Sequence, residues 1–112
     1  MFNGLVVFTV TTQSGATYTT ANSDLYQVMI QTSNASTKTV TIAPDSTMTE
    51  AVAGSAITFI NTGAGLLTFA AGSGVTITSA GAVSAAPTLA THKVAQCLRV
   101  SANTWRIYGG IG

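Results

Sequence analysis

The chain has 112 residues, a length that fits a single domain. Only 6% of these residues are charged, against about 25% in an ordinary soluble domain, while 46% are hydrophobic. The four basic residues are scattered along the chain, which argues against a nucleic-acid-binding surface, and no apolar run approaches the roughly 18 residues that a membrane-spanning helix requires.

Hydroxyl groups take the place of charges as the polar complement of the chain, with 20 Thr and 10 Ser. Threonine is β-branched and favours the pleated, half-buried surface of a strand. Together with the 11 glycines, this composition predicts an all-β chain with tight turns. A surface with so few charges hydrates a lone monomer poorly, so we expect protomers to bury surface against each other.

The first half of the chain predicts four strands separated by turn-forming residues. Asn22-Ser23-Asp24 has the chemistry of a turn, because short polar side chains bond their own backbone. In the fourth strand Val40 and Ile42 alternate with threonines, the period of two that marks a strand. The segment Thr47–Gly54 is expected to be a loop or a single helical turn. The predicted strands are Leu5–Thr11, Ala16–Thr20, Tyr26–Thr32 and Lys38–Ala43.

The second half predicts a meander of short strands that closes with a hairpin. Glycine-rich turns separate its strands, a small-residue loop covers Ala80–Ala90, and Ala102-Asn103 turns the closing hairpin. The whole pattern predicts a compact antiparallel sandwich or barrel-like module, and no 20–50-residue repeat is evident. The predicted strands are Ala56–Asn61, Leu66–Ala70, Val75–Thr78, Lys93–Ser101 and Thr104–Tyr108.

The chain offers few groups for catalysis or metal binding. Its three carboxylates, Asp24, Asp45 and Glu50, all lie in turn-like contexts, where such residues commonly bond the local backbone. A metal site needs three or four ligands, and His92 with Cys97 supplies two. The sole cysteine lies in an apolar run and is expected to be a buried, inert thiol. We therefore expect no catalytic residues, no metal, no cofactor and no enzymatic activity.

An aromatic cluster near the end of the chain has two interpretations. Alternation along a strand places Trp105 on one face and Arg106 with Tyr108 on the other. Trp105 then either packs in the core, the preferred interpretation, or forms a platform that stacks on a sugar ring.

Three segments resemble a small β-module that is frequent in virion proteins of tailed bacteriophages. Ala56–Ser79 (AITFINTGAGLLTFAAGSGVTITS) is similar to the module's central motif, Ala16–Val28 to its opening and Lys93–Ile111 to its ending. The likeness extends from about Ala16 to Gly112. Such modules occur at the ends of tail fibres and in other surface-exposed virion proteins, and the resemblance implies a homotrimer.

The leading hypothesis is a capsid decoration (cement) protein that stabilises the phage head. Here the module makes up nearly the whole sequence, without a fibre shaft, which favours the head surface over a fibre tip. Residues 1–15 form either an N-terminal arm or the first strand, and residues 16–112 form the β-module. The expected partners are other copies of the chain and the major capsid protein or other virion proteins. The candidate capsid contacts are Phe2, Leu5, Val7 and Phe8.

The alternative hypothesis is a tail fibre or tail-associated protein that recognises a host surface glycan through exposed aromatic rings. Under either hypothesis the protein is located in the virion, and the start of the sequence has no basic region or cleavage site typical of a signal peptide. The candidate glycan contacts are Tyr18, Tyr26, Trp105 and Tyr108.

Overall fold

A computed structural model describes residues 7–83 and 85–111 of the chain. Within these residues the protein forms eleven β-strands and one short 3-10 helix. The elements are β1 (Thr9–Gln13), β2 (Thr17–Thr19), the 3-10 helix η1 (Asn22–Leu25), β3 (Val28–Thr32), β4 (Lys38–Ile42), β5 (Ala56–Asn61), β6 (Leu67–Ala71), β7 (Thr76–Ser79), β8 (Ala82–Val83), β9 (Thr88–Leu89), β10 (Val94–Ser101) and β11 (Thr104–Gly109).

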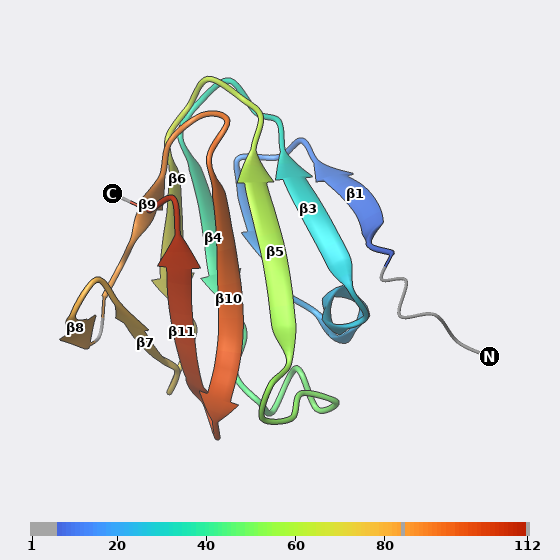
Figure 1. The fold of residues 1–112 in the computed structure, drawn as a ribbon, viewed down its shortest axis with the longest axis vertical. Helices are drawn as coiled ribbons and strands as arrows, with labels where there is room; N and C mark the ends of the chain where they lie inside the picture. The colour runs from blue at the N-terminus through green and yellow to red at the C-terminus, as the bar shows by residue number, and fades with distance from the viewer. Residues whose placement is uncertain (1–6, 84, 112) are drawn as a thin grey trace.

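The strands form two sheets that face each other across the core (Figure 1). The larger sheet has the order β1-β3-β5-β10-β11-β7-β8, and the smaller sheet has the order β2-β4-β6-β9. The predicted all-β class is confirmed. The predicted strands are recovered to within a few residues, apart from Leu5–Thr11, whose first two residues lie outside the described part. The observed first strand begins at Thr9.

The first six strands alternate between the two sheets. The chain therefore winds as a coil, in which each turn contributes one strand to each sheet. β1, β3 and β5 are parallel neighbours in the larger sheet, and β2, β4 and β6 are parallel neighbours in the smaller sheet. The predicted antiparallel meander is therefore wrong, and the segment Ala56–Ser79 places its three strands in alternating sheets. The reason is that each strand's return path runs through the opposite sheet, which supplies the long crossover that parallel pairing requires.

The closing hairpin is confirmed and lies within the larger sheet. β10 pairs antiparallel with both β11 and β5, and β11 pairs parallel with β7. The hairpin thus separates β5 from β7, two strands that precede it in the chain (Figure 1). The predicted loop Ala80–Ala90 contains the two short strands β8 and β9. The segment Thr47–Gly54 holds turns without a regular element.

Glycines allow the turns of successive coils to stack closely. A Cβ atom at Gly63 would lie 2.1 Å from the carbonyl oxygen of Asn34, and one at Gly65 would lie 1.9 Å from that of Ser36. Both distances are far below van der Waals contact, so the Gly-Ala-Gly turn after β5 fits only because it carries no side chains at these positions. The sequence suggested a hairpin turn at these two glycines. In the structure they instead let one turn of the coil pack against the turn before it.

The core is a single apolar layer between the sheets. Alternate residues of each strand point inward, as the period of two requires, and Val40 and Ile42 are buried as predicted. Phe59 of the larger sheet and Phe69 of the smaller sheet meet edge to face, with ring centroids 5.3 Å apart. The two sheets are thereby joined at their centre.

The smaller sheet presents threonines to the outside. Thr17 lies opposite Thr39, Thr39 opposite Thr68, and Thr68 opposite Thr88, so one row of hydroxyls crosses all four strands. The abundant threonines thus cover the outer face of this sheet. No helix in residues 7–83 and 85–111 is long and apolar enough to cross a membrane.

Candidate functional site

Asp24 serves as a local structural residue at η1. Its Oδ2 atom accepts hydrogen bonds from the Tyr18 hydroxyl at 2.6 Å and from the Ala21 backbone N–H at 2.9 Å. Burial, with the hydrogen bond to Asp24 as a second cause, raises the pKa of Tyr18 well above its usual value. This carboxylate ties the first coil to the helix, in keeping with the turn role expected from the sequence.

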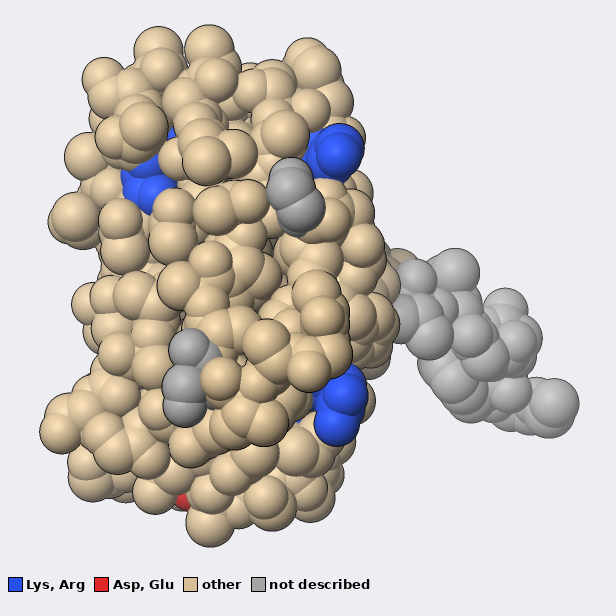
Figure 2. All heavy atoms as spheres, turned by 90° about the vertical axis from the view of Figure 1, so that its left-hand side faces the viewer, with Lys and Arg blue, Asp and Glu red and all other residues tan. Residues whose placement is uncertain are grey.

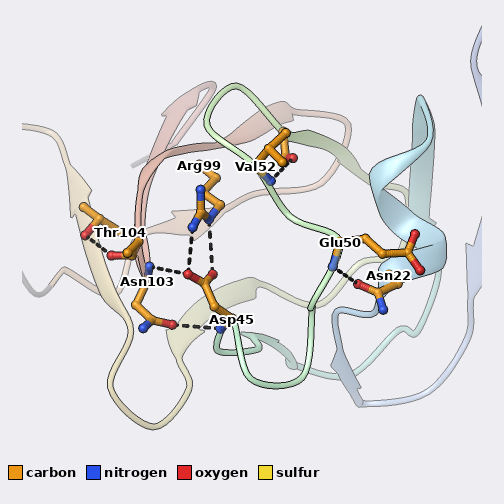
Figure 3. Close-up of polar contacts among 9 residues, drawn as sticks. Asn22, Asp45, Glu50, Val52, Arg99, Asn103 and Thr104 are labelled. Carbon is orange, nitrogen blue, oxygen red and sulfur yellow. Dashed lines mark hydrogen bonds and ion pairs between the residues drawn. The ribbon is translucent and has the colours of Figure 1, made fainter.

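Asp45 links the loop after β4 to the closing hairpin (Figure 3). Arg99 donates to it from Nε at 3.1 Å and from Nη2 at 2.7 Å. The backbone N–H of Asn103 donates to Oδ2 at 3.0 Å, and the Asp45 N–H donates back to the Asn103 side chain at 2.8 Å. The hydrogen bond from Arg99 lowers the pKa of Asp45.

Glu50 takes part in a third, exposed contact. Its side chain accepts a hydrogen bond from the Tyr26 hydroxyl. Its backbone N–H donates to the Asn22 side chain at 3.1 Å (Figure 3). Asp24 thus ties η1 to β2, whereas Asp45 and Glu50 connect the loop between β4 and β5 to the closing hairpin and to the end of η1. In the described residues no three His, Cys, Asp or Glu side chains gather as a metal site would require.

Cys97 and His92 lie in different surroundings. Cys97 is a free thiol, fully buried in the core as predicted, and this burial raises its pKa. His92 lies in the turn before β10 with a left-handed backbone (φ 67°), and its N–H donates to the carbonyl of Asn61 at 2.6 Å. A loop position for His92 agrees with the sequence prediction.

Trp105 is fully buried among the core residues, so its indole ring is not available to stack on a sugar. The proposal of Trp105 as a glycan contact is therefore wrong, and the core interpretation is confirmed. Its Nε1 finds no hydrogen-bond partner within the described chain. Arg106 and Tyr108 on the alternate positions are exposed, as the strand period predicted.

The other aromatic candidates are placed apart along the chain and differ in exposure. Tyr18 is half-buried and its hydroxyl is occupied by Asp24. Tyr26 and Tyr108 are exposed, and the Tyr108 hydroxyl bonds to Gln96 on the neighbouring strand β10.

An exposed apolar segment marks the N-terminal edge of the larger sheet. The exposed fraction is 65% at Val7, 43% at Phe8 and 57% at Val10. Val10 belongs to β1, which pairs along one side with β3. Of the four candidate capsid contacts, Val7 and Phe8 are therefore exposed, and Phe2 and Leu5 lie outside the described residues.

A shallow hollow of about 210 Å³ adjoins this edge on the outer side of the larger sheet. Phe8 forms part of its wall, together with residues from η1, β5 and β10 and from the loop before β5. The sequence did not indicate this hollow, because its walls come from segments that are separated along the chain and share no motif. The lining residues are Phe8, Leu25, Gln27, Gly54, Ser55, Ala56, Thr58 and Gln96.

The molecular surface offers little charge to attract an ionic ligand. Figure 2 shows a side of the molecule on which the few charged side chains are widely separated. The hollow itself is lined by neutral residues. Comparisons with family models, with curated proteins and with solved structures gave no match.

Proposed function

We propose that this protein is a non-enzymatic structural component of a phage virion, acting as a homotrimeric decoration protein on the capsid surface. The observation that carries the proposal is the exposed apolar edge formed by Val7, Phe8 and Val10. Apolar side chains of this size gain about 1.5–3 kcal/mol each when fully buried, so contact with a partner stabilises them.

The dispersal of the titratable groups also supports a structural role. Each carboxylate accepts a hydrogen bond that fixes the local chain, and the sole thiol is buried. A decoration protein needs a stable folded domain and an exposed edge that binds the capsid. It stabilises the shell through linkage, because many copies bind only the assembled capsid.

The first experiment is electron microscopy of virions carrying a gold label against this chain. We expect label distributed over the head. Label confined to the tail would overturn the decoration role and favour the tail-associated alternative.

A pair of point variants then tests the edge. Phe8→Ser should reduce the number of copies bound per capsid, because it removes an exposed ring from the contact. Val83→Ser is the matched control, since Val83 is 71% exposed on β8, at the opposite end of the larger sheet. Equal occupancy for both variants and the wild type would contradict the role of the edge, and deletion of Met1–Gly4 extends the test to the remaining candidate segment.

Glycan recognition is the second candidate function, and the exposure of Tyr26 and Tyr108 favours it. Tyrosine rings stack on the apolar faces of sugars while their hydroxyls remain hydrated. A glycan array probed with the purified protein tests it. Binding that is lost in Tyr26→Ala or Tyr108→Ala supports recognition, and an array without signal removes this candidate.

A further inference from the structure

We infer that the hollow on the outer side of the larger sheet binds one neutral sugar ring. The inference rests on glycan recognition, the second candidate function, and gives it a binding site. Ala56 and Thr58 of β5 lie at the middle of the hollow. They alternate with the core residues Ile57 and Phe59 and therefore point to the outside.

The side chains that line the hollow fit a neutral ligand with hydroxyl groups. Phe8 and Leu25 offer apolar surface, and Phe8 is 43% exposed. A sugar ring has apolar C–H faces and a rim of hydroxyls, so it matches both parts of the lining, whereas an ionic ligand finds no charge to pair with. The uncharged hydrogen-bonding side chains of the lining are Gln27, Ser55, Thr58 and Gln96.

The size of the hollow limits its occupant to a small molecule. Its volume of about 210 Å³ is below the roughly 300–1,000 Å³ of sites that take drug-sized ligands. A single ring therefore suits it better than a chain of several rings.

The Thr58 hydroxyl is a polar group without a protein partner inside the hollow. Thr58 is only 8% exposed, and within residues 7–83 and 85–111 its hydroxyl forms no hydrogen bond. Nearly all polar groups this deep in a protein are paired, so the hydroxyl needs either water or a ligand in the hollow. A sugar hydroxyl supplies that partner.

Backbone hydrogen bonds fix the segments around the hollow. The Thr9 N–H donates to the Gln27 carbonyl at 2.9 Å and holds the start of β1 against the start of β3. The Gly54 N–H donates to the Arg99 carbonyl at 2.7 Å, and the Arg99 N–H donates to the Ser55 carbonyl at 2.8 Å. A site that gains few contacts needs such order in advance, because ordering it on binding would offset the gain.

The two glutamines of the lining are constrained as well. The side-chain oxygen of Gln96 accepts a hydrogen bond from the Tyr108 hydroxyl, which leaves the amide N–H groups for a ligand. Gln27 has a left-handed backbone (φ 55°), a conformation that residues other than glycine seldom adopt and that is concentrated at ligand sites.

The two exposed tyrosines of the glycan candidate flank this hollow. Tyr26 lies between the lining residues Leu25 and Gln27 in the chain, and Tyr108 bonds to Gln96. Leu25 and Gln27 precede β3, whereas Gln96 belongs to β10, and β5 lies between these two strands. A ring in the hollow therefore has a tyrosine on each side, where the next units of a longer glycan would stack.

The test titrates the purified protein with free glucose, galactose, mannose and N-acetylglucosamine and follows the amide chemical shifts by NMR. At least one of these sugars should shift the signals of Ser55, Thr58 and Gln96. The dissociation constant should lie in the millimolar range, because one ring makes few contacts. The same proteins are applied to the glycan array.

Two variants with matched controls locate the binding. Ala56→Leu fills the hollow and should abolish sugar binding, whereas Ala70→Leu makes the same change at an outward position of the smaller sheet and should leave it unchanged. Thr58→Val keeps the shape of the side chain and should weaken binding by about three- to tenfold, the loss of one hydrogen bond. Thr68→Val on the smaller sheet is its control, and the NMR spectrum shows whether each variant is folded.

The outcomes separate the site from the function. Sugar binding that Tyr26→Ala or Tyr108→Ala removes and Ala56→Leu leaves unchanged would overturn the hollow as the site, while glycan recognition would stand. Absence of binding to the free sugars and to the array would overturn both. The variants leave Val7, Phe8 and Val10 intact, so capsid occupancy remains a separate measurement. If Ala56→Leu lowers that occupancy in a protein that binds no sugar, the hollow belongs to the capsid contact and the inference fails.

Discussion

Asp45 and Arg99 are 54 positions apart in the sequence and meet in a two-pronged ion pair, with Nη2 and Oδ2 separated by 2.7 Å. The pair joins the loop after β4 to β10, and Asn103 adds a bond to the same carboxylate. One acidic residue therefore connects the coiled part of the fold to the inserted hairpin.

Replacing Asp45 with Asn should destabilise the protein by about 1–2 kcal/mol at neutral pH, because the ion pair and the bond from Asn103 are weakened together. The folded-state pKa of Asp45 is lowered, so its contribution is present above the unfolded value of about 3.9 and is lost as the pH falls through the folded value. Urea unfolding at several pH values measures this, and the wild-type and variant stabilities should converge in acid. Glu50→Gln, at an exposed contact, serves as the control and should change stability less; an equal loss in both variants would contradict the prediction.

Gly63→Ala should destabilise the protein by at least about 2 kcal/mol, because the new methyl group would lie 2.1 Å from the Asn34 carbonyl oxygen, which belongs to the backbone and yields little. Gly15→Ala is the matched control, since its Cβ atom would lie at 3.4 Å from the nearest heavy atom. Thermal unfolding of the two variants measures the difference. Equal melting temperatures would show that the turns of successive coils do not stack as described.

Cys97 should not react with a thiol reagent in the folded protein. Its side chain is fully buried, so a reagent cannot reach the sulfur atom. Burial also raises the pKa of the thiol, so little of the reactive thiolate is present. In urea the thiol should react at the rate of an ordinary cysteine, and the reaction rate under native conditions then reports unfolding. Rapid reaction of the folded protein would contradict the burial of Cys97.

Trp105 fluorescence should show the blue-shifted emission of a buried indole and should resist quenching by acrylamide, because the ring lies fully inside the core. Addition of glycans should leave the emission unchanged even if the exposed tyrosines bind them. The unfolded protein provides the reference for a hydrated indole. A strong response of the folded protein to acrylamide would contradict the buried position.

The positions of the strands were predictable from the sequence because alternation and turn residues are local signals. Ala56–Asn61 has the same bounds in prediction and structure, and Lys38–Ala43 differs by one residue. The pairing of the strands was not predictable in this way. Whether β5 pairs with β6 or with β3 depends on contacts between residues about thirty positions apart, such as Met29 with Thr58, and alternation within a strand carries no information on them.

The candidate site was predictable only in part, for a similar reason. The exposure of Tyr108 and the burial of Trp105 follow from the period of two along one strand. The hollow beside Phe8 has walls from several elements, and no spacing in the sequence brings Leu25 near Gln96. The coil left no repeat in the sequence, since the offsets between paired strands differ: Thr9 pairs with Val28, whereas Met29 pairs with Thr58.

The position of β10 and β11 between β5 and β7 also determines when the protein can finish folding during its synthesis. The ribosome releases β5 and β7 before the hairpin that must separate them, so the hydrogen-bonding edge of β5 stays unpaired until the hairpin emerges. An open edge next to Ile57 and Phe59 invites pairing with another nascent chain. The larger sheet therefore closes only late in synthesis, and conditions that slow translation should favour aggregation over the native fold.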